Sequence, residues 1–492
     1  MPTPEFTGDP REIELKFDYD GLDRDRLLAA LGALSRAGSA HQLVSTYFDT
    51  PARDIGRAGY TLRVRRDGGR RIQTVKAVTA DAGLFQRGEW EHPVRGDVPR
   101  LDHHSGPLAE VLDAAVLGRI APVFVTDVRR TLFRFDDAGS AFDVAVDDGE
   151  VRTAGGAERL CEVELELRCG TPRVLFDLAR SLNEQVPLRL GVRSKAERGF
   201  ALADDERPDA FKAEPIQLDP ESDAADAFGA IARACIRQFR LNETRLLETG
   251  AAEALHQARV GLRRLRSAFT IHASLLSHDP RTDLLRAELR WLAAELGEVR
   301  NIDVLIPRVG QEAGAMLRME RDRLFEHVRA ELAGARTRLL MIDLTEWLTA
   351  GAWRTEPAHP ARLHREVGAF ARNVLEKRCG RLRRRGEGLS KMDREHWHRV
   401  RIEAKKLRYA SEFFVSLYTG DRDRRRHKHF LQALEALQDQ LGELNDLVVG
   451  PQLLAKLGID AELPNAGKHA VSGLLDRADN AFRALLRTKH FW

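Results

Sequence analysis

Alternating charged and apolar side chains dominate the first 200 residues of this 492-residue chain. Near its start, a strand would place Glu12, Glu14 and Lys16 on one face and two aliphatic side chains on the other. The same two-residue period recurs in the segments 61–66, 71–77, 142–147 and 161–168. Turn residues such as Asp67-Gly68-Gly69 separate these segments, while residues 22–34 have a helical pattern. An α+β domain with an antiparallel sheet is therefore predicted.

The charged faces of these predicted strands carry both signs of charge. They hold the basic residues Arg63, Arg65, Lys76 and Arg87 and the acidic residues Glu89, Asp143, Asp147, Glu162, Glu164 and Glu166. Contact with water would account for any one such face, but recurrence on several strands predicts a sheet curled into a β-barrel around a charged tunnel. Crowded carboxylates repel one another unless a hard cation such as Mg²⁺ or Mn²⁺ intervenes, and facing arginines can bind phosphate in bidentate fashion. This combination is typical of a site for a metal-bound polyphosphate.

Several of these residues also occur in a recognisable order along the chain. The order is Glu12-x-Glu14-x-Lys16, Tyr47-Phe48-Asp49-Thr50, Arg63-x-Arg65, Lys76, Arg130, Asp147, Glu162-x-Glu164 and Ser194-Lys195. With this order, over roughly the first 200 residues, the chain resembles the CYTH proteins, or triphosphate tunnel metalloenzymes. That family includes inorganic triphosphatases, thiamine triphosphatases and class IV adenylate cyclases. The resemblance implies an enzyme that acts on a triphosphate.

The resemblance also implies roles for individual residues. Metal ligands, for Mg²⁺ or Mn²⁺, would be Glu12, Glu14, Asp147, Glu162 and Glu164. The phosphate chain would be bound by Lys16, Arg63, Arg65, Lys76, Arg130 and Lys195, with Arg87 and Glu89 as further residues of the tunnel wall. The catalytic set would be Glu12, Glu14, Lys16, Glu162 and Glu164, and which glutamate orients the attacking water stays open. Because no set of aromatic residues for a thiamine ring or a nucleobase is apparent, we expect inorganic triphosphate as the substrate.

The pattern changes after the stretch 203–222, which contains three prolines and shows no clear periodicity. We expect a linker at residues 205–221 between a domain of residues 1–204 and a helical domain of residues 222–492. Residues 1–205 hold 29 Lys and Arg against 34 Asp and Glu, whereas the remainder holds 49 against 41. The acidic first part suits a metal ion, and the basic second part suits an anion.

A basic motif led by histidine occurs twice in the helical part. The two copies are His256, Arg259, Arg263, Arg264 and Arg266, then His398, Arg401, Lys405, Lys406 and Arg408. Most of these residues recur at steps of three or four, which places them on one helical face that needs either water or a bound anion. A Leu-Gly-Glu segment follows each copy, at 296–298 and 441–443. We therefore predict an all-α duplicated helical bundle with repeats at about 222–350 and 360–492.

Both copies resemble the CHAD family, a helical domain named for its histidines, over roughly residues 220–490. The resemblance implies two related helical bundles that bind inorganic polyphosphate, with the ten motif residues as ligands. A polyanion can bind such a surface by releasing counterions, without recognition of bases. The arginine-rich runs at 381–385 and 424–428 are expected to be solvated loops.

Other functions stay open at the level of sequence. An inactive tunnel would leave a protein that only binds polyphosphate or associates with polyphosphate granules, and an adenylate cyclase is a further alternative. Nucleic acid is disfavoured because the basic faces have few interleaved aromatic residues for stacking. The four cysteines show neither a metal-site nor a disulfide pattern, and no apolar run reaches the length of a membrane span. We therefore expect a cytoplasmic protein without a membrane partner.

Overall fold

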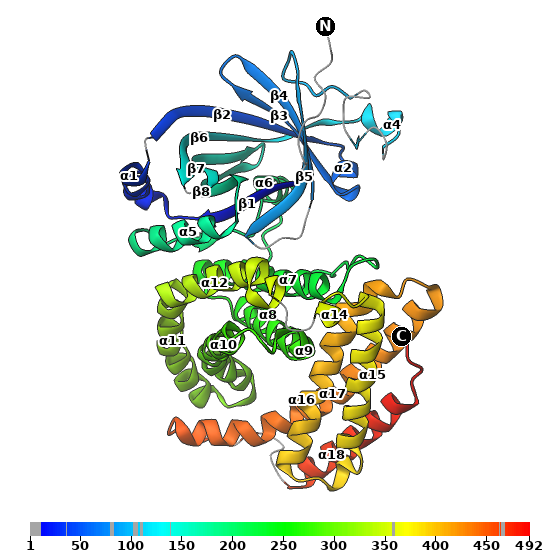
Figure 1. Cartoon of the computed structure of the whole chain (residues 1–492). Helices are drawn as coiled ribbons and strands as arrows, with labels where there is room; N and C mark the ends of the chain where they lie inside the picture. Colours follow the sequence, from blue (N-terminus) through cyan, green and yellow to red (C-terminus); the bar gives the residue numbers. More distant parts are fainter. Residues whose placement is uncertain are drawn as a thin grey trace. The chain divides into compact units, whose positions relative to one another are not determined.

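The computed structural model describes residues 11–35, 37–78, 83–101, 107–108, 112–137, 139–356, 360–461, 463 and 468–492. The chain divides into two compact units (Figure 1). The first comprises Met1–Asp209 with Ala333–Ala350, and the second comprises Ala210–Leu332 with Gly351–Trp492. Strands dominate the first unit, and the second unit is mostly helical.

The described part of the first unit contains one antiparallel sheet of nine strands. The strands are β1 (Arg11–Asp18), β2 (Ala37–Asp49), β3 (Tyr60–Asp67), β4 (Arg70–Ala77), β5 (Leu84–Pro93), β6 (Ala121–Asp137), β7 (Ser140–Thr153), β8 (Gly156–Cys169) and β9 (Arg189–Leu190). Their order is β5-β4-β3-β2-β6-β7-β8-β1-β9, and β1 also pairs with β5, with Arg11 opposite Gly88 and Leu15 opposite Leu84. Each strand from β2 to β8 therefore has two neighbours, and β1 has three. The four predicted strand segments lie within β3, β4, β7 and β8, so the predicted antiparallel sheet is confirmed.

The first unit also contains helices, several of which contact the sheet. They are α1 (Arg24–Leu34), α2 (Asp54–Arg57), α4 (Ala114–Leu117), α5 (Arg173–Gln185), α6 (Lys195–Ala203) and α12 (Ala335–Ala350). The helix expected at 22–34 is α1, preceded by a 3-10 turn. α12 lies far along the sequence but packs on α5, where Arg180 Nη2 is 2.8 Å from Asp343 Oδ1 and also pairs with Glu346.

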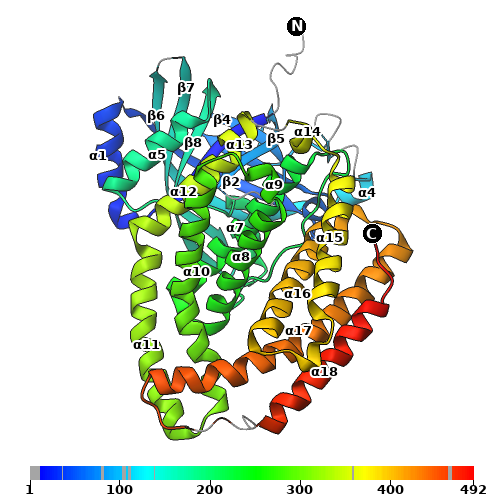
Figure 2. The same cartoon turned by 60° about the horizontal axis from the view of Figure 1, so that its bottom comes forward.

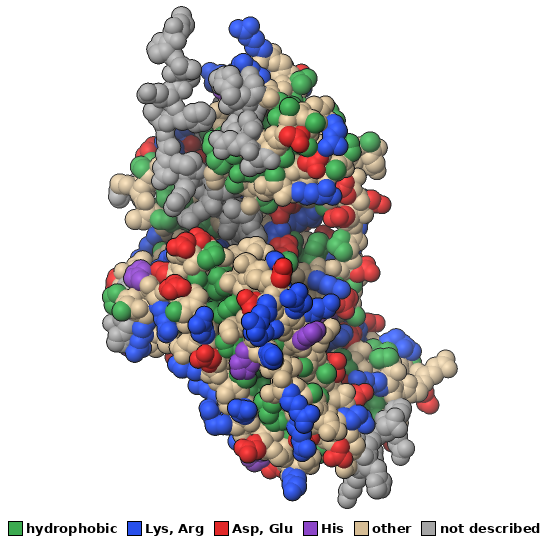
Figure 3. All heavy atoms as spheres, turned by 90° about the vertical axis from the view of Figure 1, so that its right-hand side faces the viewer, with side chains coloured by type: hydrophobic (Ala, Val, Ile, Leu, Met, Phe, Trp, Pro, Cys, Tyr) green, Lys and Arg blue, Asp and Glu red, His purple; other side chains and the backbone are tan. Residues whose placement is uncertain are grey.

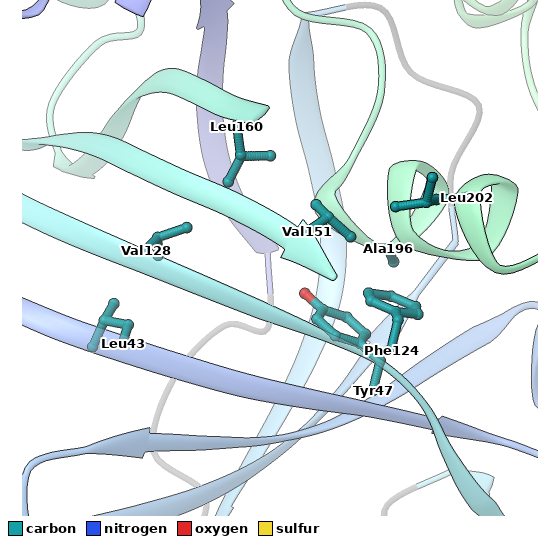
Figure 4. Packing of buried hydrophobic residues seen from close by; sticks show 8 residues of the cluster. All are labelled: Leu43, Tyr47, Phe124, Val128, Val151, Leu160, Ala196 and Leu202. Carbon is teal, nitrogen blue, oxygen red and sulfur yellow. The ribbon is translucent and has the colours of Figure 1, made fainter. Parts of the chain in front are cut away.

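Two apolar clusters hold the sheet together. One contains Phe48, Ile55, Leu62, Val64, Val75 and Leu108. In the other, Ala196 and Leu202 of α6 pack on Phe124 of β6, and the rings of Phe124 and Tyr47 stack with centroids 4.5 Å apart (Figure 4). Ser194 begins α6 with a capping box to Glu197, so the orientation of this helix is fixed both by its cap and by its apolar face.

Gly199 is the point of closest approach between α6 and the sheet. A Cβ added here would overlap the ring of Phe124. We expect Gly199→Ala to lower the free energy of unfolding by about 1–3 kcal/mol, because a filled core cannot accept the methyl group without moving the helix. Urea unfolding measures the change. The matched control is Gly32→Ala in α1, where an added Cβ meets no heavy atom within 4 Å. Equal unfolding midpoints for the two variants would contradict the close approach.

The second unit consists mainly of helices, most of them long. They are α7 (Ala224–Thr249), α8 (Ala252–Ile271), α9 (Ala273–Leu276), α10 (Arg281–Leu305), α11 (Gln311–Ala333), α13 (Ala352–Thr355), α14 (Pro360–Leu363), α15 (Val367–Gly386), α16 (Arg394–Phe414), α17 (Asp421–Lys456) and α18 (Lys468–Arg487). The two basic motifs lie on α8 and α16, which pack against α7 and α15 respectively. α8 contacts both α10 and α16 and lies between them (Figure 2). No helix of the described residues is both long and apolar enough to cross a membrane.

Two arginine-rich segments differ from the expectation for them. The arginine-rich runs at 381–385 and 424–428 are not loops, because they lie inside α15 and α17. No glycine or proline interrupts either run, and acidic residues in the first turn of α17 favour the start of that helix. The last part of the predicted linker packs within the second unit, where Ile216 and Leu218 are buried and the Leu218 N–H donates to Ser416 Oγ over 3.1 Å.

Candidate functional site

Three carboxylates converge in the first unit. Asp147 of β7 lies opposite Glu162 of β8 in the strand register, and Glu164 follows two residues later on the same face of β8. One carboxylate oxygen from each residue lies within 4.8 Å of the others, and Asp147 and Glu162 are both 0% exposed. We call this group the carboxylate centre.

Three cations face the carboxylate centre. Lys16 of β1 lies opposite Glu164 in the register, with Nζ 2.9 Å from Glu164 Oε1 and 3.5 Å from Glu162 Oε1. Lys195, the first residue of α6, places Nζ 2.9 Å from Asp147 Oδ2 and 2.7 Å from Glu164 Oε1, and it also pairs with Glu162. Arg130 of β6 donates two hydrogen bonds to Asp147, of 2.7 and 2.6 Å, and one of 2.5 Å to Glu164. Strand pairing and the start of α6 therefore bring together residues from five elements, β1, β6, β7, β8 and α6.

These ion pairs keep Asp147 and Glu164 of the carboxylate centre ionised. Burial alone would raise the pKa of Asp147, but Arg130 and Lys195 lower it to about 2. Burial is likewise outweighed at Glu164, where Lys16 and Lys195 hold the pKa well below its usual value. Burial disfavours the charged form of Lys16, yet the glutamates around it raise its pKa well above the usual value. Asp147 and Glu164 therefore face the three cations as charged groups at neutral pH.

The carboxylate centre has the donor set that a hard divalent cation needs. Its ligand atoms are carboxylate oxygens, which Mg²⁺ and Mn²⁺ prefer. Oε2 of Glu162 is buried and has no hydrogen-bond partner among the described residues. A buried anionic oxygen without a donor is costly unless a ligand satisfies it. The residues present therefore fit a metal ion.

A basic group lies on the neighbouring strands β3 and β4. Lys76 Nζ is 2.6 Å from Glu89 Oε2, and Arg63 Nη2 is 3.6 Å from Glu89 Oε1. Arg63 also donates a hydrogen bond of 3.4 Å to the hydroxyl of Tyr47. The sequence pattern assigned no role to Tyr47. Burial and the charges of Arg63 and Arg130 lower the pKa of Arg65 to about 10, and its Nε has no hydrogen-bond partner in the described structure. An anion beside Arg65 would stabilise its charged form and could accept a hydrogen bond from its Nε.

The other residues predicted for this site are not all buried beside the carboxylate centre. Glu14 is buried, with Oε1 3.5 Å from Lys16 Nζ, whereas Glu166 is exposed. The side chains of Glu12 and Arg87 lie outside the described residues, although their backbones pair with each other between β1 and β5. Asp49 caps a turn, accepting hydrogen bonds from three backbone N–H groups between residues 50 and 56.

The second unit contains a basic pocket of about 370 Å³ between α8, α10 and α16. Its lining comprises Arg263, Arg266, Ser267, Thr270, Arg286, Leu289, Arg290, Arg401, Ile402, Lys405, Lys406 and Tyr409. Arg263 Nε donates to the Tyr409 hydroxyl over 2.7 Å, so the two copies of the motif meet at the pocket. Figure 3 shows Lys and Arg side chains gathered over one face of the helical unit, among Asp and Glu side chains.

Half of the ten motif residues line this basic pocket. They are Arg263, Arg266, Arg401, Lys405 and Lys406, whereas His256, Arg259, Arg264, His398 and Arg408 do not line it. Arg264 is buried and donates to Gln238 over 3.0 Å, while Arg408 donates to Glu412 over 2.8 Å. The motif did not reveal Arg286 and Arg290 of α10. Their spacing of four on the helix that carries the first Leu-Gly-Glu segment is the signal that could have found them.

Two comparisons with protein families cover most of the chain. The family model described as CYTH domain matches residues 10–200, and the one described as CHAD domain matches residues 230–455. Among individual proteins, an inorganic triphosphatase of Haemophilus influenzae is 28% identical over 201 residues, which are 39% of this chain and 55% of that protein. The chain thus matches about half the length of this relative.

Two further relatives extend the comparison to the helical half. An uncharacterised protein of Mycobacterium tuberculosis is 26% identical over 488 residues, covering 92% of this chain and 89% of that protein. The crystal structure of the CHAD domain from the plant Ricinus communis is 30% identical, with a TM-score of 0.46, over 57% of this chain and 97% of that one. The chain therefore belongs to both families, with a CYTH domain at residues 10–200 and a CHAD domain at residues 230–455.

Proposed function

We propose that the CYTH domain is a metal-dependent inorganic triphosphatase whose active site lies in a β-barrel tunnel. The observation that carries this proposal is the carboxylate centre with a buried, unsatisfied oxygen on Glu162, together with the basic group around Arg63 and Arg65 in the same sheet, where the charge of Arg130 acts on Arg65. The pairing of β1 with both β5 and β8 supports a closed tunnel. The similarity to an inorganic triphosphatase supports the choice of substrate.

The charges of the site suit a triphosphate. Lys16, Lys195 and Arg130 already balance the carboxylate centre, so a bound divalent cation adds positive charge that only an anionic ligand can offset. When bound, Mg²⁺ or Mn²⁺ would neutralise the phosphates and favour departure of pyrophosphate. Asp147, Glu162 and Glu164, with Glu12 and Glu14, would hold it. Arg63, Arg65 and Lys76 would position the phosphate chain, and a glutamate of β8 would orient the attacking water.

Phosphate release from tripolyphosphate tests this function. The full chain should release orthophosphate with Mg²⁺ or Mn²⁺, should fail to do so with chelator, and should lose turnover when Glu14 is replaced by alanine. Thiamine triphosphate and ATP serve as competing substrates, and formation of a cyclic nucleotide from ATP would favour the cyclase instead. Absence of turnover with every metal and triphosphate would contradict an enzyme and favour a protein that only binds polyphosphate.

We further propose that the CHAD domain binds inorganic polyphosphate in the basic pocket, as a store, a source of substrate or an attachment to polyphosphate granules. The specific observation is that arginines and lysines of both motif copies and of α10 converge on one cavity. Their mutual repulsion supports this proposal. Burial, Arg290 and Arg263 together lower the pKa of Arg266, so an anion in the pocket would relieve the repulsion.

Binding to this pocket should depend on pH through Lys405. Burial and the neighbouring Arg263, Arg401 and Arg259 lower the pKa of Lys405 to about 6, while Asp446 acts weakly in the opposite direction. Lys405 is therefore mostly neutral in the free protein at pH 7, and a phosphate chain that favours its charged form takes up a proton on binding. Affinity should rise by at most about tenfold per unit as the pH falls from about 8 to 6, and then level off.

Titration with a long polyphosphate measures this dependence, because its terminal groups, which ionise near neutral pH, are few. Lys405→Met should remove the rise in affinity between the two pH values. If the Lys405→Met variant kept the full dependence of affinity on pH, a group other than Lys405 would be responsible for it.

A further inference from the structure

The two copies of the basic motif differ in their acidic neighbours. Aligning His256 with His398 places Thr270 of α8 opposite Glu412 of α16. Aligning the two Leu-Gly-Glu segments places Arg290 of α10 opposite Glu435 of α17. Apolar positions support this second alignment, because Leu289, Leu292 and Leu296 and their counterparts Leu434, Leu437 and Leu441 are all 0% exposed. The second copy thus carries two glutamates where the first carries a threonine and an arginine.

These two glutamates meet at one arginine. Arg408, the counterpart of Arg266, donates from Nε to Glu412 Oε1 over 2.8 Å, and its Nη2 is 3.6 Å from Glu435 Oε1. Glu412 Oε2 also lies 3.9 Å from Nε of the buried Arg264. In the first copy, Arg266 lines the basic pocket, and the charged neighbours that act on it among the described residues are Arg290 and Arg263.

The lining of the basic pocket differs between the two copies in the same way. Its third wall comes from α10, through Arg286 and Arg290, and the described lining includes no residue of α17. The electrostatic surroundings of the paired arginines are opposite in sign. Burial, Arg290 and Arg263 lower the pKa of Arg266, whereas at Arg408 the effect of burial is outweighed by Glu412, which raises the pKa.

We propose that Glu412 and Glu435 close the second copy's counterpart of the basic pocket to phosphate, so that the duplicated domain holds a polyphosphate chain on the α10 side only. This inference rests on the proposed binding of polyphosphate by the CHAD domain. The two glutamates then determine specificity, because they restrict the ligand to the short stretch of chain that one cavity of about 370 Å³ admits. The two glutamates act by pairing with the guanidinium of Arg408, which would otherwise be able to bind phosphate oxygens.

The test gives the second copy the residues of the first. In the full chain, Glu412→Thr with Glu435→Arg should tighten binding of a long polyphosphate at least about tenfold. It should also steepen the salt dependence by about two to three log units per log unit of salt, since the change adds three positive charges and frees Arg408. The isosteric Glu412→Gln should give a smaller change in the same direction and serves if the double variant does not fold.

The matched control is Glu395→Thr with Asp439→Arg. It changes the charge of α16 and α17 equally at two exposed positions outside the pocket, and its effect should stay below about twofold at moderate salt. If the wild-type chain binds polyphosphate but the Glu412 variants match the control, this inference is wrong and the proposed binding stands. If the wild-type chain does not bind at all, the proposed function of the CHAD domain itself fails.

Discussion

Phosphate release from tripolyphosphate should fall at least about 100-fold when Glu162 is replaced by glutamine. The amide keeps the size of the side chain but removes a charge that Lys16 and Lys195 approach, and it replaces the buried oxygen that lacks a hydrogen-bond partner. A divalent cation would then have two carboxylates of the centre, Asp147 and Glu164, in place of three. Turnover measured against metal concentration reports this loss, because half-maximal activity should need more Mg²⁺ or Mn²⁺ in the variant.

Glu166→Gln provides the matched control for this prediction. Glu166 lies on the same face of β8, two residues beyond Glu164, but it is exposed and lies outside the carboxylate centre. Its replacement should change turnover by less than about threefold, because it leaves the three carboxylates of the centre in place, although Glu166 is near enough for burial, Glu14 and Glu164 to raise its pKa. If Glu162→Gln kept both its turnover and its metal requirement, while unfolding at the same urea concentration, the carboxylate centre would not be the metal site.

The strand pattern predicted much of the site because the two-residue period fixes faces without knowledge of the fold. Glu162 and Glu164 share a face of β8 for this reason alone, as do Glu14 and Lys16 on β1. The period does not fix the partners of a strand. Asp147 faces Glu162 only through the register of β7 with β8, and Lys195 reaches both only because α6 begins there. Such contacts depend on pairings between distant segments, which a local pattern does not encode.

In the helical domain, a spacing of three to four residues likewise predicts which residues share a helical face but not which neighbours they contact. The spacing correctly placed Arg263 and Arg266 on one side of α8, and both line the pocket. It did not separate Arg266 from its counterpart Arg408, because the difference arises from Glu412 on the same helix and Glu435 on α17. Arg264 follows Arg263 directly and therefore points elsewhere, into the interior beside Gln238. Which basic residues meet a cavity depends on the neighbouring helices as well as on the helix that carries them.

Binding of polyphosphate should weaken at least about 100-fold when Arg263 and Arg401 are both replaced by alanine. The two arginines come from different motif copies and line the same cavity, and the charge of Arg263 contributes to the lowered pKa of Arg401. Arginines that repel one another in the free protein lose that penalty when phosphate lies between them, so the pair should contribute more together than separately. The salt dependence of binding should become shallower by about 1.4 log units per log unit of salt, since two charges are removed.

The control removes two arginines that lie elsewhere on the same helices or their neighbours. Arg399→Ala with Arg424→Ala changes the net charge equally, but these exposed residues pair with Glu395 and Asp421 and do not line the pocket. Affinity in the control should stay within about twofold of the wild type at moderate salt, because both arginines are exposed to solvent and already paired with a carboxylate. Equal losses in both variants would show that polyphosphate responds to the net charge of the domain. A loss confined to Arg263→Ala with Arg401→Ala assigns binding to the cavity, where both copies of the motif contribute cations to one space.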